Sequence, residues 1–165
     1  MVHLEVHQLV DLSAEKAWES VSDFSNVQHI HPLVRDVDQL TENGNGLGAA
    51  RRCHFYDDGT LEEEIIEWDE PAKHYKIKVL NGTLPLNSMV ITVRVEDVNP
   101  KQSRLFATVE FDPKYAFVGQ LLGRYILKPK LGEVLGNMLA GVQYYENKGF
   151  DVPEGWKAPH KAVVV

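Results

Sequence analysis

The chain has 165 residues, of which 17 are basic and 24 acidic, giving a formal net charge of −7. This length is enough for one globular domain that buries a core and encloses a cavity without disulfides. The negative charge argues against a general nucleic-acid binder, because such proteins neutralise phosphates with a basic face. The single cysteine, Cys53, excludes an internal disulfide and a cysteine-based zinc cluster. No apolar run approaches the roughly 20 residues of a membrane span and no secretion signal precedes the first strand, so we expect a cytoplasmic protein without a membrane span.

The N-terminal part predicts a strand and two short helices. Apolar side chains of one parity indicate a half-buried strand over residues 2–10. Ser13 is a suitable N-cap for a short helix that runs to Asp23. A turn and a second short helix follow, and this helix ends before Pro32 because the residue preceding a proline is pushed out of the α region.

The middle of the chain, residues 33–111, predicts an antiparallel meander of short strands. Turn residues separate these strands at Asn43-Gly44-Asn45-Gly46, Asp57-Asp58-Gly59, Glu70-Pro71, Asn81-Gly82 and Asn99-Pro100. From Leu131 to Tyr145, apolar residues recur at three- and four-residue steps, which predicts a long amphipathic helix that Pro129 kinks or divides. We therefore expect a single domain over residues 1–149 and an extended C-terminal tail over residues 150–165, whose terminal valines would add to a neighbour.

The hairpin between the third and fourth strands decides which side chains share a face of the sheet. A two-residue Asp58-Gly59 loop would pair Arg52 with Ile65 and mix charged and apolar groups on both faces. We favour a three-residue Asp57-Asp58-Gly59 loop with Gly59 in the left-handed conformation, because it separates apolar from charged pairs. Its pairs are Phe55 with Leu61, Cys53 with Glu63, Arg51 with Ile65, Arg52 with Glu64 and His54 with Glu62.

This register points two charged side chains, Arg51 and Glu63, toward the apolar face of the sheet. An isolated buried charge is very costly, so each group needs a partner, a water molecule or a ligand. A salt bridge in a closed core would satisfy both groups, and so would an ion pair that lines a hydrated cavity. We favour the cavity, because large inward-facing polar groups more often mark a pocket than a dry interior.

Short segments between Val2 and about Lys148 follow a recognisable order. They are Ala14-Glu15-Lys16-Ala17-Trp18 with Val21-Ser22-Asp23-Phe24, His31-Pro32, Gly48-Ala49-Ala50-Arg51, Asp58-Gly59-Thr60-Leu61-Glu62-Glu63, Leu84-Pro85-Leu86-Asn87 and Phe111-Asp112-Pro113. In this order and spacing they resemble the polyketide cyclase/dehydrase and lipid-transport family. That family (SRPBCC) belongs to the START-like group, which includes the Bet v 1 allergens and the plant abscisic acid receptors.

The resemblance implies an α+β helix-grip fold. A curved antiparallel sheet of seven strands would surround the long C-terminal helix, with two short helices between strands one and two and a largely apolar cavity inside. By position, Arg51 and Glu63 look like the inward arginine and glutamate of family members. Asn87 resembles a pocket asparagine on the sixth strand, and His31 resembles a histidine at the edge of the cavity. Ala107 stands where a tryptophan is frequent, which would enlarge the cavity.

Four further residues complete the candidate ligand-binding site. Tyr75 would contact a polar group of the ligand, and Cys53, Phe55 and Phe111 would line the cavity. Cys53 has no adjacent base in the sequence, which favours a small buried hydrophobe over a nucleophile.

Metal and cofactor binding find no support in the sequence. The seven histidines are scattered over separate segments, so we expect no metal site, and no motif calls for a cofactor. Arg124 and Tyr125 lie close to the long helix and belong either to the pocket or to the surface, with the surface favoured by residue type.

The sequence therefore favours a protein that binds or transports a small hydrophobic or amphipathic molecule, such as a lipid, a polyketide-like or an aromatic compound. Arg51 would then contact an anion or a carbonyl group. The alternative is a cyclase or dehydratase acting on a poly-carbonyl substrate in the same cavity, with Arg51 stabilising an enolate and Glu63 or His31 moving protons. A third possibility is an interaction module that buries the C-terminal tail or the glycine face of the long helix against a partner. The same glycines would also suit a helix–helix contact in a homodimer.

Overall fold

The computed structural model describes residues 1–165, with the side chains of all of them except Ala116. Its elements are β1 (Val2–Val10), α1 (Ala14–Ser22), the 3-10 turn η1 (Phe24–Asn26), α2 (Val27–Ile30), β2 (Val34–Gln39), β3 (Ala50–Phe55), β4 (Thr60–Asp69), β5 (His74–Gly82), β6 (Leu86–Asn99), β7 (Gln102–Pro113), α3 (Ala116–Leu122), the π-helical turn η2 (Gly123–Leu127), α4 (Lys128–Lys148) and β8 (Val163–Val164).

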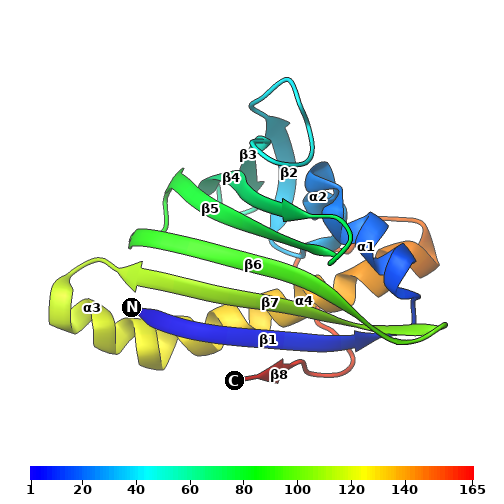
Figure 1. The fold of residues 1–165 in the computed structure, drawn as a ribbon. Helices are drawn as coiled ribbons and strands as arrows, with labels where there is room; N and C mark the ends of the chain where they lie inside the picture. The colour runs from blue at the N-terminus through cyan, green and yellow to red at the C-terminus, as the bar shows by residue number, and fades with distance from the viewer.

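The strands form one curved antiparallel sheet against which α4 packs, while α1 and α2 close one end (Figure 1). The meander β2 to β7 is confirmed, and β1 returns to pair with β7, so the order is β2-β3-β4-β5-β6-β7-β1-β8. The α+β helix-grip prediction is therefore confirmed. No helix in the described part of the chain is long and apolar enough to cross a membrane.

The sheet has eight strands, one more than the seven expected. The extra strand, β8, comes from the C-terminal tail and pairs with β1. The Glu5 amide donates to the Val165 carbonyl at 3.0 Å, and the Val165 amide donates back to the Glu5 carbonyl at 2.8 Å. The terminal valines thus cover the edge of β1, which would otherwise expose unpaired backbone groups.

The β3–β4 hairpin differs from the expected register by two residues. The Phe55 amide donates to the Gly59 carbonyl at 2.9 Å, so the loop consists of Tyr56, Asp57 and Asp58. Asp58, with a φ of 68°, is the left-handed residue, whereas Gly59 has no positive φ. Position 59 favours glycine for another reason, since a Cβ there would lie 2.9 Å from Asp57 Oδ1.

This correction leaves the assignment of faces intact, because side chains alternate with a period of two and the register moves by two. Arg51 and Glu63 still point inward, and they now lie directly opposite each other. Arg51 pairs with Glu63 instead of Ile65, and Cys53 pairs with Leu61 instead of Glu63. On the outer face, Arg52 pairs with Glu62 instead of Glu64, and His54 pairs with Thr60 instead of Glu62. Phe55 lies opposite the Gly59 end of the loop instead of Leu61.

The long helical region is divided near Pro129, as predicted. Pro129 lies in the first turn of α4, and the π-helical turn η2 directly precedes that helix. A proline lacks the N–H of a helical residue and crowds the preceding turn, which a π-helical turn accommodates.

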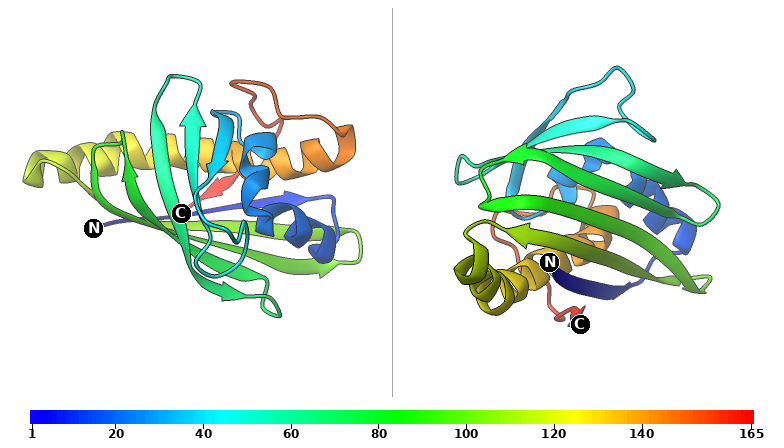
Figure 2. Two further views of the ribbon diagram at one scale, coloured as in Figure 1. Left: turned by 90° about the horizontal axis from the view of Figure 1, so that it is seen from above. Right: turned by 60° about the vertical axis from the view of Figure 1, so that its left-hand side comes forward.

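Close contacts fix both α2 and the tail against α4. A Cβ at Gly141 would lie 2.1 Å from the Ile30 carbonyl oxygen, and one at Gly136 would lie 2.7 Å from the Ala162 Cβ. The Val152 amide donates to the His29 carbonyl at 2.9 Å. The tail therefore returns along α4 (Figure 2), and the glycines of this helix face the chain itself.

Candidate functional site

A cavity of about 510 Å³ lies between the sheet and α4. The inward faces of β3 to β6 line it on one side, and α2 and the N-terminal half of α4 line it on the other. This volume lies in the range of small-molecule sites. Exposed lining residues at two hairpin tips and on α4, among them Tyr56, Asp57 and Lys130, mark where the cavity reaches the surface.

Arg51 and Glu63 form a buried ion pair in the wall of this cavity, with only 7% and 3% of their surfaces exposed. Arg51 Nε and Nη2 lie 2.8 and 2.7 Å from the same Glu63 oxygen, Oε2. Arg51 Nη1 donates to the Phe24 carbonyl at 2.5 Å, and the guanidinium lies 3.8 Å from the centre of the Phe24 ring. Among the described residues no hydrogen bond involves Glu63 Oε1, so the carboxylate keeps an acceptor for another molecule.

Arg51 remains charged in this environment. Burial by itself lowers the pKa of Arg51, but the carboxylate of Glu63 opposes this and raises it above its ordinary value. Because the pair as a whole carries no net charge, it presents the cavity with hydrogen-bonding groups and little net field.

His31 lies close by and is neutral near pH 7. Burial, followed by the positive charge of Arg51, lowers the pKa of His31 from 6.5 to about 4. The His31 Nδ1 atom accepts a hydrogen bond from the Leu33 amide at 3.1 Å. The neutral ring therefore carries its proton on Nε2, which makes His31 a hydrogen-bond donor in the wall of the cavity.

Tyr75 and Cys53 are also uncharged cavity residues. Burial raises the pKa of each to about 12. The Tyr75 hydroxyl donates to the Val21 carbonyl at 2.9 Å, which ties β5 to the end of α1. Cys53 Sγ lies 3.8 Å from Glu63 Oε2 and stays a thiol, in keeping with a small buried side chain.

Comparison with known proteins agrees with this geometry. A sequence profile described as polyketide cyclase/dehydrase and lipid transport matches residues 1–142. The chain belongs to this family. No protein among the curated sequences matches the chain.

Solved structures resemble this member of the polyketide cyclase/dehydrase family over nearly their whole length. A START superfamily protein from Mycobacterium smegmatis has a TM-score of 0.72 at 15% identity, covering 89% of this chain and 99% of its own. The Zhui aromatase/cyclase from Streptomyces sp. R1128 has a TM-score of 0.70 at 17% identity, covering 92% and 99%. The protein XoxI from Bacillus cereus has a TM-score of 0.72 at 17% identity, covering 87% and 94%. At these identities the likeness concerns the fold.

Six of the eight site residues expected for this family member line the cavity. They are Arg51, Glu63, Tyr75, His31, Cys53 and Phe55. Their convergence follows from strand alternation on β3, β4 and β5 and from the position of His31 at the end of α2.

Asn87, Phe111 and Ala107 lie outside the lining, which corrects their expected placement. Asn87 is exposed, with Nδ2 3.2 Å from Asp112 Oδ2, because a register shift at the start of β6 turns it away from the face that Met89 shares. Phe111 is fully buried beneath η2, where a Cβ at Gly123 would lie 3.4 Å from its ring. Ala107 is fully buried in the core on β7, so it does not enlarge the cavity.

The apolar wall contributed by α4 comes from the predicted helical stripe, which was expected to supply affinity, although none of its residues was singled out as a site residue. Leu131, Val134, Leu135 and Met138 line the cavity, whereas Leu139, one residue further along α4, is fully buried in the core. The helical stripe signals burial for all of them, but it does not distinguish a residue that faces a cavity from one that faces packed side chains.

One cluster on the outer face of the sheet has the residue types of a metal site. Asp36, Asp38 and His54 bring potential ligand atoms within 4.8 Å of one another. His54 Nε2 lies 2.7 Å from Asp38 Oδ2, Arg35 pairs with Asp36 at 2.9 Å, and Arg52 lies 4.0 Å from Asp38. Arg52 also pairs with Glu62 at 2.6 Å, and Arg35 lies 3.6 Å from Asp58, so the cluster is part of a wider ion-pair network of the sheet surface.

Proposed function

We propose that the protein binds a small hydrophobic or amphipathic molecule in its cavity and carries or sequesters it. The observation that supports this proposal is the Arg51–Glu63 pair, buried in the wall of an otherwise largely apolar space of about 510 Å³. Apolar walls supply affinity, and a few fixed polar groups orient a ligand.

The polar groups indicate the kind of head group that the cavity would accept. His31 Nε2 and the remaining guanidinium N–H groups of Arg51 are donors, and Glu63 Oε1 is an acceptor. Because Glu63 neutralises Arg51, a neutral carbonyl or hydroxyl group satisfies these partners better than a full negative charge. The ligand would thus be a lipid, a polyketide-like or an aromatic compound with an uncharged polar end.

Native and denaturing mass spectra test this proposal. The freshly purified protein is measured alone and after incubation with a long-chain alcohol, a sterol and a hydroxylated aromatic ketone. We expect a one-to-one adduct that survives native conditions and disappears on denaturation. Bare protein in every sample would count against binding in the cavity.

The alternative is a cyclase or dehydratase acting on a poly-carbonyl substrate. The convergence of Arg51, His31 and Glu63 in one cavity favours it, since Arg51 would stabilise an enolate while His31 or Glu63 moved protons. Against it, the pKa of His31 is about 4 and those of Tyr75 and Cys53 are about 12, far from the range in which acid–base catalysis is efficient at neutral pH. A bound poly-carbonyl compound recovered unchanged in both mass and chromatographic retention would favour the binding function, and a cyclised isomer or a dehydrated product would favour the enzyme.

A further inference from the structure

The segment from Tyr115 through η2 presents large apolar side chains to solvent. The exposed fractions are 74% for Tyr115, 76% for Phe117, 61% for Val118, 45% for Leu121, 45% for Leu122, 71% for Tyr125 and 56% for Ile126. We call these seven residues the α3 face. An ordinary surface helix buries such side chains and exposes polar ones, so this helix has the opposite orientation.

Glycines on the inner side of the helix explain the orientation. A Cβ at Gly119 would lie 1.7 Å from the Lys114 carbonyl oxygen, and one at Gly123 would lie 2.8 Å from Pro113 Cγ. The helix therefore approaches β7 at Gly123, and the turn that follows β7 at Gly119, too closely for a larger side chain at either position. If the helix rotated to bury Phe117, large side chains would replace Gly119 and Gly123 at these close contacts and would not fit. The α3 face therefore stays directed outward.

Basic residues accompany the α3 face. Residues 113–132 contain Lys114, Arg124, Lys128 and Lys130 and no aspartate or glutamate, although the whole chain carries a net charge of −7. Lys114, Arg124 and Lys130 are exposed, and Lys128 is half-buried. This end of the molecule therefore combines apolar, aromatic and cationic groups.

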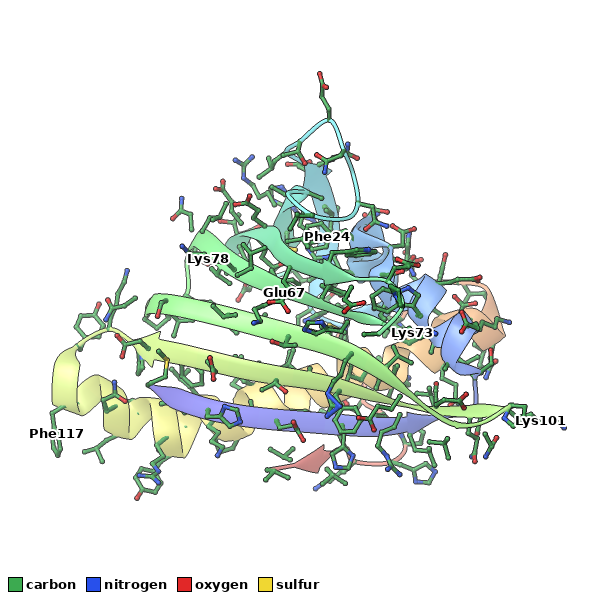
Figure 3. The ribbon with its side chains drawn as sticks, viewed as in Figure 1. Phe24, Glu67, Lys73, Lys78, Lys101 and Phe117 are labelled. Atoms are coloured by element: carbon green, nitrogen blue, oxygen red, sulfur yellow. The ribbon has the colours of Figure 1, made fainter. Side chains whose placement is uncertain are left out.

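The α3 face lies at one extremity of the molecule and next to the cavity. The helix projects past the end of β1 (Figures 1 and 2), and Phe117 points away from the sheet at its tip (Figure 3). Leu127 and Lys130, which directly follow the α3 face in the chain, line the cavity.

We propose that the α3 face docks on the surface of a membrane that contains anionic lipids. Helices that lie in a membrane interface combine an apolar face, aromatic rings at the head-group level and cations that attract anionic lipids. A second copy of the chain is a poorer occupant, because a symmetric contact would bring the same cations together. Docking also places the cavity beside the lipid, so that a hydrophobic ligand can pass between them; this last point alone rests on the proposed function.

Vesicle flotation tests the docking. Wild-type protein is mixed with vesicles of phosphatidylcholine alone or of phosphatidylcholine with phosphatidylserine. We expect flotation with the anionic vesicles and weakening by salt. Phe117→Ala should weaken binding about tenfold or more, since a buried phenyl group is lost. The double variant Lys114→Gln, Arg124→Gln should lose about fivefold for each charge removed.

Two matched variants at the opposite end of the molecule serve as controls. Phe150 is 61% exposed near the C-terminal end of α4, and Lys101 lies at the β6–β7 turn, far from Phe117 (Figure 3). Phe150→Ala and Lys101→Gln should float like wild type.

Three outcomes would overturn the docking proposal. They are no flotation with anionic vesicles, an equal loss in the control variants, and a concentration-dependent dimer that Phe117→Ala abolishes while vesicles do not bind. The last outcome would assign the α3 face to a homodimer. Binding of a soluble ligand, measured without vesicles, should be unchanged in Phe117→Ala, so failure of docking and failure of the cavity are separable.

Discussion

Arg51 and Glu63 lie opposite each other on β3 and β4, and the two guanidinium nitrogens that contact Glu63 reach a single oxygen, Oε2. The other carboxylate oxygen therefore stays available within a buried, neutral pair. This arrangement serves both the stability of the sheet and the recognition of a polar head group, and variants can separate the two.

A double-mutant cycle separates structure from binding. Arg51→Met or Glu63→Leu alone should lower the free energy of unfolding by about 3–5 kcal/mol, because each leaves an unpaired buried charge. The combined variant should recover most of this loss, since apolar side chains of similar volume can replace a buried ion pair, yet it should no longer hold a polar-headed ligand. Urea unfolding of the four proteins provides the measurement. If the combined variant lost as much free energy of unfolding as the two single variants together, the two side chains would not be coupled.

Acid should destabilise the protein through His31. The pKa of His31 is about 4 in the folded protein and about 6.5 in an exposed histidine, so below pH 6.5 the unfolded chain binds a proton that the folded chain does not. This stability is complete above pH 6.5 and is lost as the pH falls to about 4, by up to about 3 kcal/mol. The free energy of unfolding, measured with urea at several pH values in this range, should fall less steeply with decreasing pH in His31→Gln than in wild type. The exposed His3→Gln is the control, and equal slopes in all three proteins would refute the assignment.

Glu70 joins two indole rings, and its loss should destabilise the closed end of the sheet. Glu70 Oε1 accepts from Trp18 Nε1 at 2.9 Å, and Oε2 accepts from Trp68 Nε1 at 3.1 Å. Glu70→Ala leaves the N–H of the buried Trp18 without its acceptor, at a cost of about 1–3 kcal/mol in the free energy of unfolding. The exposed Glu42→Ala should change stability by less than about 0.5 kcal/mol. Indistinguishable thermal denaturation curves for the two variants would contradict this role.

Gly141→Ala should destabilise the protein, although replacing glycine by alanine within a helix normally stabilises it. Replacing glycine by alanine inside a helix gains up to about 1 kcal/mol. At Gly141, however, the added Cβ would lie 2.1 Å from the Ile30 carbonyl oxygen. Gly141→Ala should therefore lose about 1–3 kcal/mol, as overpacked sites do, whereas Asn147→Ala on the exposed face of α4 should not. A higher melting temperature for Gly141→Ala would show that α2 and α4 are not packed this closely.

The inward direction of Arg51 and Glu63 could be predicted because it depends only on strand alternation. Their pairing could not, because it depends on whether Asp58 or Gly59 takes the left-handed conformation. Asp58 tolerates that conformation. Position 59 favours glycine because a Cβ there would lie 2.9 Å from side-chain oxygens of Asp57 and Thr83, a contact that only the folded structure shows.

Two features, the direction of the Asn87 side chain and the strand with which the terminal valines pair, were not predicted, for related reasons. A register shift at the start of β6 breaks the period of two and turns Asn87 outward, although parity would place it on the face of Met89. The pairing of Val163 and Val164 with β1 joins segments from opposite ends of the chain. Local sequence patterns carry no information about either contact.

A fluorescence titration with N-phenyl-1-naphthylamine, an uncharged aromatic dye with one polar N–H group, tests the binding cavity most directly. The cavity-filled variant Val134→Trp, Met138→Trp changes two lining residues of α4, and its melting curve checks that it folds. Phe117→Ala removes an exposed ring instead. We predict one-to-one binding with a blue shift in wild type and in Phe117→Ala, and at least about tenfold weaker binding in the filled variant, which lacks the space for an apolar body. Binding that survives filling of the cavity but disappears in Phe117→Ala would contradict the account.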